Sequence, residues 1–191
     1  MKHIVILFSV IFLLNSCSQH NPTIIFETEL GNITVELYPD KAPITANNFL
    51  QYVEENRLQE ATFYRTVTLD NQPGSEVKIE VIQGGLYEDN HPDALPPIEH
   101  ETTERTGILH KDGVISLARY GPGSATCEFF ICVGDQPSLD FGGSRNGDGQ
   151  GFAAFGKVID GMDVVHKIHH SPANDQYLEP RIKIESVEIT E

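Results

Sequence analysis

Four short stretches of this chain of 191 residues together carry arginine, glutamine and aromatic residues. The stretches are 63–65 (FYR), 81–85 (VIQGG), 113–119 (GVISLAR) and 128–132 (EFFIC). A guanidinium stays charged at ordinary pH and offers several N–H donors in one fixed plane. A permanent charge beside apolar aromatic surface suits a reaction in which no covalent bond breaks and no proton moves.

Rotation about the amide bond before a proline is such a reaction. Its barrier is about 18–20 kcal/mol, because delocalisation of the nitrogen lone pair makes the C–N bond partly double. In the twisted transition state the prolyl nitrogen becomes pyramidal and can accept a hydrogen bond. A donor placed there binds the transition state better than the ground state, which is the condition for catalysis. Arg65 is the candidate donor, and this chemistry needs no metal, cofactor or nucleophile.

Short strands and tight turns surround these residues. Runs of alternating or continuous apolar residues predict strands at 24–30, 33–38, 63–69, 76–82, 113–118, 128–133, 152–158 and 182–189. One helix is expected from Pro43 to near Asn56, with Thr45 as its N-cap, and a second at 162–168. We therefore predict an all-β fold, a closed antiparallel barrel of about eight strands capped by two short α-helices.

Two polar connections interrupt this pattern. The segment Asp70–Ser75 is a strong turn signal, and the glycine-rich segment 141–151 must form a loop. Residues 144–149 approach a calcium-loop pattern, but the pattern begins with Ser144 and its twelfth position is Phe155. We predict no metal site there. A calcium-dependent adhesion module built on this loop is an alternative function. It requires that calcium raise the melting temperature of the protein.

The N-terminus has the features of an export signal. Lys2 and His3 precede an apolar run at 4–14, which is too short to span a bilayer as a stable helix. The following 14–17 (LNSC) resembles a bacterial lipobox, in which Cys17 becomes the lipid-modified first residue. An ordinary signal peptide that is cut nearby is the alternative.

These features predict a signal peptide at 1–16, a lipidated tether at 17–22 and one domain at 23–191. The expected location is outside the cytoplasm, on a bacterial membrane, at its periplasmic or outer-membrane face. The net charge of −15 argues against nucleic acid and anionic lipid headgroups as partners. The membrane is therefore expected to be contacted through the lipid anchor only, and the domain is expected to be a monomer.

Cys127 and Cys132 lie five residues apart in one expected strand, so their side chains should point to opposite faces. A disulfide between them would require a broken strand. We expect two buried free thiols.

Taken in order, the four stretches resemble those of cyclophilin-type peptidyl-prolyl isomerases. Residues 63–65 look like the family's Phe-His-Arg, and 82–85 match its Ile-Gln-Gly-Gly. The resemblance implies that Arg65 is the catalytic arginine and that Gln83 binds the substrate backbone. It implies a peptidyl-prolyl cis-trans isomerase that acts on unfolded or flexible proline-containing polypeptides and assists the folding of exported proteins.

The same resemblance assigns the other substrate contacts. Ala118 and Arg119 match the stretch that receives the residue before proline. Phe130 and Leu139 match walls of the proline pocket, and Phe152 stands where the family has a pocket histidine.

Several positions depart from the family pattern. The connection between Arg65 and Gln83 is longer than usual, Glu80 replaces a pocket phenylalanine, and Ser138 replaces a tryptophan. Glu80, Ser138 and Phe152 favour an alternative function, a catalytically weakened proline-peptide binding module or holdase chaperone.

Structural readings of the site residues are also open. An arginine in an apolar strand is often an ion-pair partner, and for Arg65 that partner would be Glu128. Gln83 on its own would be a turn residue before Gly84.

Overall fold

The computed structural model describes residues 20–88 and 90–190. The elements in chain order are β1 (Thr23–Thr28), β2 (Gly31–Leu37), α1 (Pro43–Glu54), β3 (Thr62–Val67), β4 (Val81–Gly85), α2 (Thr103–Thr106), β5 (Val114–Leu117), β6 (Phe129–Cys132), the short 3-10 helix η1 (Pro137–Leu139), β7 (Ala153–Asp160), α3 (Met162–His169), β8 (Ala173–Asn174) and β9 (Tyr177–Ile189). The predicted signal peptide and the lipidated Cys17 lie outside the described residues.

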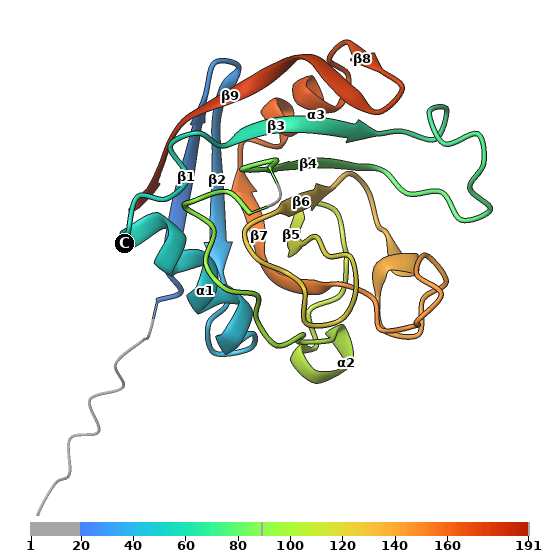
Figure 1. Ribbon diagram of the computed structural model, residues 1–191, viewed down its shortest axis with the longest axis horizontal. Helices are drawn as coiled ribbons and strands as arrows, with labels where there is room; N and C mark the ends of the chain where they lie inside the picture. Colours follow the sequence, from blue (N-terminus) through green and yellow to red (C-terminus); the bar gives the residue numbers. More distant parts are fainter. Residues whose placement is uncertain (1–19, 89, 191) are drawn as a thin grey trace, which may run out of the picture.

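The strands form a closed antiparallel barrel (Figure 1). Their order is β1-β2-β7-β5-β6-β4-β3-β9, and pairing of β9 with β1 closes the ring of eight. The two-residue β8 adds to the outer edge of β9. The predicted barrel is confirmed. The expected strand 76–82 is shorter than predicted, since β4 begins only at Val81 and residues 68–80 form a long connection.

Phenylalanine rings fill the barrel. Five of them are fully buried, namely Phe26, Phe49, Phe63, Phe129 and Phe155. Their ring centroids lie 5.1–6.3 Å apart, mostly in tilted or edge-to-face arrangements that aromatic pairs prefer. This dense interior leaves no room for a ligand, so any binding site must lie on the outside of the barrel.

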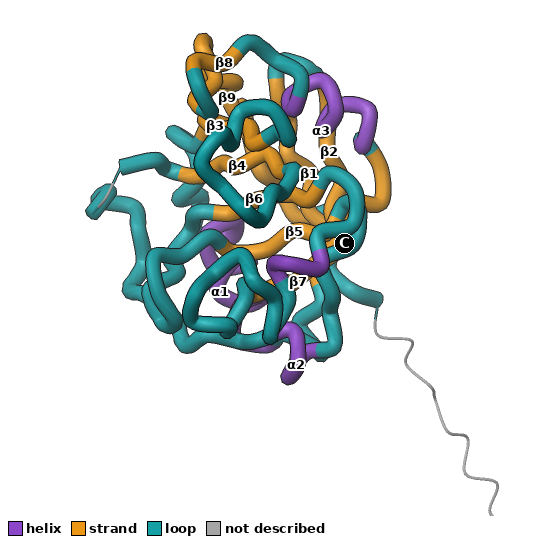
Figure 2. Tube along the Cα trace, turned by 90° about the vertical axis from the view of Figure 1, so that its right-hand side faces the viewer, coloured by secondary structure: helices purple, strands orange, loops and turns teal. Residues whose placement is uncertain are grey.

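The two predicted helices are present and lie on opposite sides of the strands (Figure 2). The single turn α2 is a third helix that was not predicted from the sequence. None of the helices within the described residues has the length and apolar character needed to cross a membrane.

The predicted N-cap of α1 is wrong. The cap is Ala42, and Thr45 lies inside the first turn. The backbone N–H and hydroxyl of Thr45 both donate to Oε2 of the fully buried Glu101, at 2.7 and 2.8 Å. A carboxylate that is 56 residues away in the sequence therefore satisfies a free donor at the start of the helix.

The two cysteines are free and buried, as expected. Burial raises the pKa of the Cys127 thiol to about 11 and raises that of Cys132 as well. Neither thiol is activated as a nucleophile.

We predict that Glu101→Ala destabilises the domain. The substitution leaves the buried donors of Thr45 without an acceptor, which costs about 2 kcal/mol in the free energy of unfolding. Urea denaturation measures this difference. Glu104→Ala, which removes an exposed carboxylate from α2, is the matched control and should change stability by less than about 0.5 kcal/mol. Equal stability of the two variants would contradict the role of Glu101.

Candidate active site

A second apolar cluster lies outside the barrel core. Its members are Val67, Ile79, Val81, Phe130, Cys132 and Leu139, with Ala118 and Phe152 packed against it. Because side chains alternate along a strand, Phe129 and Ile131 of β6 point into the barrel while Phe130 and Cys132 point outward. The cluster therefore covers the outer face of the neighbouring strands β3, β4 and β6. Four predicted pocket residues, Ala118, Phe130, Leu139 and Phe152, meet here.

The aromatic wall of this cluster is held rigidly. The rings of Phe130 and Phe152 meet edge to face with centroids 5.2 Å apart. The other side of Phe130 stacks on the buried ring of His110. Nδ1 of His110 lies 2.7 Å from the Asp140 carboxylate and Nε2 lies 3.0 Å from the Ser116 hydroxyl.

The set of Ser116, His110 and Asp140 has the connectivity of a hydrolytic triad. Ser116 is completely buried, however, so no substrate can reach its hydroxyl. Ser116 therefore does not act as a nucleophile, and the three residues instead orient the Phe130 ring. Sequence reasoning missed it, because the three residues are brought together only by the fold.

Arg65 lies on the same outer face because of a β-bulge. Phe63 points into the core, and strict alternation would turn Arg65 inward as well. The register of β3 against both β4 and β9 shifts between Phe63 and Arg65, which re-aims the arginine. Arg65 is consequently half-buried beside Val67, a member of the apolar cluster.

Two amide oxygens hold the guanidinium of Arg65. Nη1 donates to Oε1 of Gln83 at 2.8 Å, and Nε donates to Oε1 of Gln176 at 3.0 Å. Partial burial lowers the pKa of Arg65, but a guanidinium begins so high that it keeps its charge. Gln176 precedes β9, where Tyr177 pairs with Arg65. It was missed in the sequence, since it stands 111 residues away.

The alternative of an Arg65–Glu128 ion pair is wrong. The Glu128 carboxylate accepts the Tyr64 hydroxyl and, at 3.0 Å, the backbone N–H of Tyr87. Burial, and then proximity to this carboxylate, raise the pKa of Tyr64.

The same contacts fix the orientation of Gln83. A carboxylate only accepts hydrogen bonds, so the Tyr64 hydroxyl donates to Glu128 and its oxygen accepts from Nε2 of Gln83 at 2.6 Å. Oε1 of Gln83 therefore faces Arg65. The second N–H of the Gln83 amide is not used in these contacts.

A cleft with a volume of about 710 Å³ opens beside this arrangement. It reaches three of the predicted substrate-binding residues, Gln83, Ala118 and Arg119. Ala118 borders both the cleft and the apolar cluster, so the two form neighbouring parts of one binding surface.

The guanidinium of Arg119 is bound within the protein. It donates to both carboxylate oxygens of Asp148, at 2.7 and 2.9 Å, and to the carbonyl of Gly151. Its side chain is only 1% exposed, and it lies 5.3 Å from the centre of the Phe152 ring. The hydrogen bonds from Arg119 lower the pKa of Asp148 to about 2. The side chain of Arg119 thus anchors the glycine-rich loop. Only the backbone of Arg119 remains for the predicted substrate contact.

Glu80 itself is not a member of the apolar cluster. Its two neighbours, Ile79 and Val81, both belong to it. The long connection thus contributes an isoleucine to the cluster.

Comparisons with known proteins agree with this geometry. The model of the family "Cyclophilin type peptidyl-prolyl cis-trans isomerase/CLD" matches residues 23–189. A peptidyl-prolyl cis-trans isomerase of Acinetobacter baylyi is 37% identical over 172 residues, which are 88% of this chain and 83% of the relative. Peptidyl-prolyl cis-trans isomerase B of Escherichia coli is 36% identical, over 75% of this chain and 81% of its own.

Solved structures share the fold. A cyclophilin-type isomerase of Cryptosporidium parvum superimposes with a TM-score of 0.70 at 19% identity, covering 90% of this chain and 99% of the other. The same protein in the presence of the dipeptide Ala-Pro gives a TM-score of 0.68 at 18% identity, over 88% and 99% of the two chains. The family match, the barrel and the outward-facing Arg65 agree, and the chain belongs to the family of cyclophilin-type peptidyl-prolyl cis-trans isomerases.

Proposed function

We propose that this cyclophilin-type isomerase accelerates rotation about X-Pro bonds in exported polypeptides and so assists their folding. Uncatalysed proline isomerisation takes tens of seconds or longer, which is slow enough to limit folding. The observation that carries the proposal is the charged Arg65 at the rim of an apolar cluster, held by Gln83 and Gln176.

Each part of the surface has a role in this reaction. The apolar cluster around Phe130 and Leu139 receives the proline ring. Gln83 offers an N–H to the backbone of the substrate, and Arg65 donates to the prolyl nitrogen as it becomes pyramidal. This donation is stronger in the transition state than in the ground state, so it lowers the barrier. The Ala-Pro dipeptide that accompanies a related fold supports a proline-containing ligand.

A binding module or holdase without turnover is the second candidate. The observation that favours it is the hydrogen-bonding of Gln83, whose amide already serves both Arg65 and Tyr64. A substrate must then compete for or share these groups. This candidate predicts affinity for proline peptides with no faster exchange between their cis and trans forms.

The calcium-dependent module has little support. Asp148 is the sole carboxylate in residues 141–151, and it is bound to Arg119. Calcium sites need several oxygen ligands with negative charge, and this loop offers one that is already neutralised.

We predict that Arg65→Ala lowers kcat/KM for a proline peptide by about 100-fold or more, because removal of one transition-state donor has effects of this size. Two-dimensional exchange NMR on the domain 23–191 measures the rate without a coupling protease. Arg105→Ala is the control, since Arg105 is exposed and pairs with Glu99. Wild-type rates in Arg65→Ala would rule out the mechanism, while tight peptide binding by an inactive wild type would favour the holdase.

Gln176 is predicted to be a positioning residue. Gln176→Ala should lower kcat about 5–10-fold with little change in KM, because Arg65 loses one of its two fixed acceptors. Asn174→Ala, at an exposed position three residues from Tyr177, is the control and should remain at the wild-type value. A loss confined to KM would contradict a role through Arg65.

The location rests on Cys17, and we propose a lipid anchor there. Expression of the full chain in bacteria with a labelled fatty acid should label the wild type and Cys127→Ser, but not Cys17→Ser. The labelled protein should sediment with membranes. Label in Cys17→Ser, or none in the wild type, would contradict the anchor. Sedimentation equilibrium of the domain tests the expected monomer.

A further inference from the structure

The two connections that depart from the family pattern meet at Arg145. The hairpin connection 68–80 and the glycine-rich loop 141–151 extend from the same side of the barrel (Figure 1). Nη1 of Arg145, in the loop, donates to the hydroxyl of Ser75 at 2.6 Å and to the carbonyl of Val77 at 2.5 Å. One arginine nitrogen therefore joins the two connections.

This junction lies at the edge of the proline pocket. The hairpin connection runs from Val77 into Ile79 and Val81, which are members of the apolar cluster. The glycine-rich loop begins and ends beside two other members, Leu139 and Phe152. Burial lowers the pKa of Arg145, and the charge of Arg65 lowers it further, which places the two guanidinium groups within electrostatic reach.

Arg145 has no carboxylate partner among residues 20–88 and 90–190. No Asp or Glu oxygen of these residues lies within 4.0 Å of it, although the chain has 28 acidic against 13 basic residues. The other arginine that contacts this loop, Arg119, is paired with Asp148. Arg145 is half-buried, and the acceptors of its Nη1, the Ser75 hydroxyl and the Val77 carbonyl, are both neutral oxygens. Uncompensated charge in such a place is unfavourable, and an anion would relieve it.

We propose that Arg145 forms a subsite for the carboxylate of an Asp or Glu residue that follows the proline in the substrate. The inference rests on the proposed isomerase function and names its substrate preference. The residue before the proline is expected at Ala118 and Arg119, beside the cleft. No lining residue of that cleft comes from the segments 68–80 or 141–151. The junction at Arg145 therefore serves the other side of the proline.

The charges of the two sides agree with one direction of binding. The cleft beside Ala118 contains the carboxylates of Glu88 and Glu128. The opposite side contains Arg145 and Arg65, and among the described residues no carboxylate, including those of the connection 68–80, forms an ion pair with either guanidinium. A peptide with an acidic residue after the proline matches this arrangement, and a planar guanidinium can bind a carboxylate through two parallel hydrogen bonds.

The test compares peptides that differ in one residue. Five peptides of otherwise identical sequence carry Glu, Gln or Lys directly after the proline, or Glu or Gln directly before it. Exchange NMR gives kcat/KM for each with the domain 23–191. The expected preference for Glu over Gln after the proline is about five-fold, and it should disappear in 0.5 M salt. Glu before the proline should give no preference over Gln.

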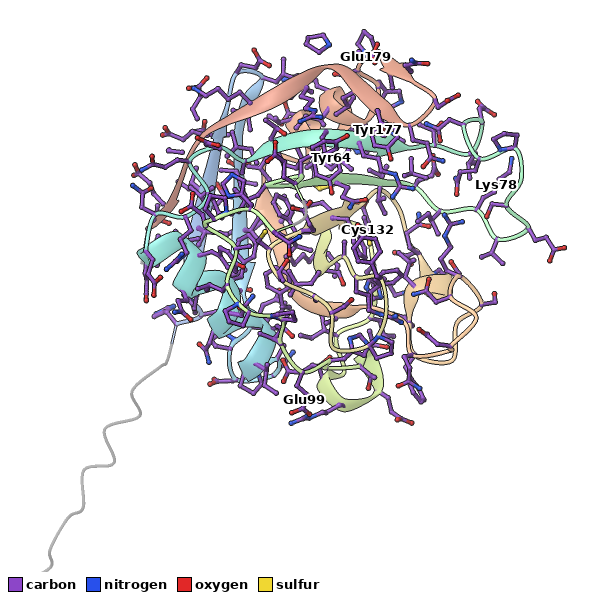
Figure 3. The ribbon with its side chains drawn as sticks, viewed as in Figure 1. Tyr64, Lys78, Glu99, Cys132, Tyr177 and Glu179 are labelled. Atoms are coloured by element: carbon purple, nitrogen blue, oxygen red, sulfur yellow. The ribbon has the colours of Figure 1, made fainter. Side chains whose placement is uncertain are left out.

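Arg145→Gln should reduce the Glu-to-Gln ratio to about one, and Arg145→Lys should keep part of it. Lys78→Gln is the matched control. Lys78 is an exposed cation of the same hairpin connection, and its side chain lies at the outer edge of the molecule (Figure 3). The control should keep the wild-type ratio. Because both peptides are measured on the same protein, a partly unfolded variant does not change the ratio.

The outcomes distinguish failure of the Arg145 subsite from failure of the isomerase function. Equal rates for the Glu and Gln peptides in an active wild type would overturn the subsite and leave the isomerase intact. An equal loss of the ratio in Lys78→Gln and Arg145→Gln would also overturn it, since the general charge of the connection would then be the cause. No acceleration of any peptide would overturn the proposed function itself.

Discussion

A β-bulge between Phe63 and Arg65 decides on which side of the barrel the arginine lies. Without it, the alternation of β3 would place a charged guanidinium among the phenylalanines of the core, where it would be strongly destabilising. With it, Phe63 completes the interior and Arg65 joins the outward residues of β3, β4 and β6. The barrel thus acts as a rigid, filled support, and its outer face is the surface that can bind a peptide.

The acceptors around Arg65 are as important as its position. Gln83 and Gln176 fix the guanidinium in place without neutralising it, so its charge remains available to a substrate. Glu128 is near, but it is occupied by Tyr64 and the backbone of Tyr87 and acts only through the orientation of Gln83. Neutral acceptors, together with a carboxylate that is bound by other groups, therefore combine precise placement with retained charge, which electrostatic catalysis requires.

Much of the fold and part of the site could be predicted from the sequence, because short strands carry their own signals. The alternation in 128–133 correctly indicates one inward and one outward phenylalanine, and the order of the motifs indicates Arg65, Gln83 and Phe130. The remainder depends on contacts between distant residues. Glu101 replaces a local cap at Thr45, and Gln176 reaches Arg65 from the other end of the domain. No local pattern encodes such pairs.

The effects of the departures from the family pattern could likewise be determined only from the structure. Glu80 suggested a weakened pocket, and the structure shows that its neighbours Ile79 and Val81 both contribute to the apolar cluster. Arg119 was expected to face the substrate, but its side chain is used by the glycine-rich loop. In both cases the sequence identifies the right segment, and packing decides which atoms of it are exposed.

The central claim is that Arg65 acts as a positioned and uncompensated positive charge, and Gln176→Glu tests it most directly. This substitution keeps the size and the oxygen acceptor at position 176 and adds a negative charge beside the guanidinium. The account predicts that kcat, measured by exchange NMR on a proline peptide, falls at least about ten-fold while the fold is retained. A kcat equal to that of the wild type would contradict it.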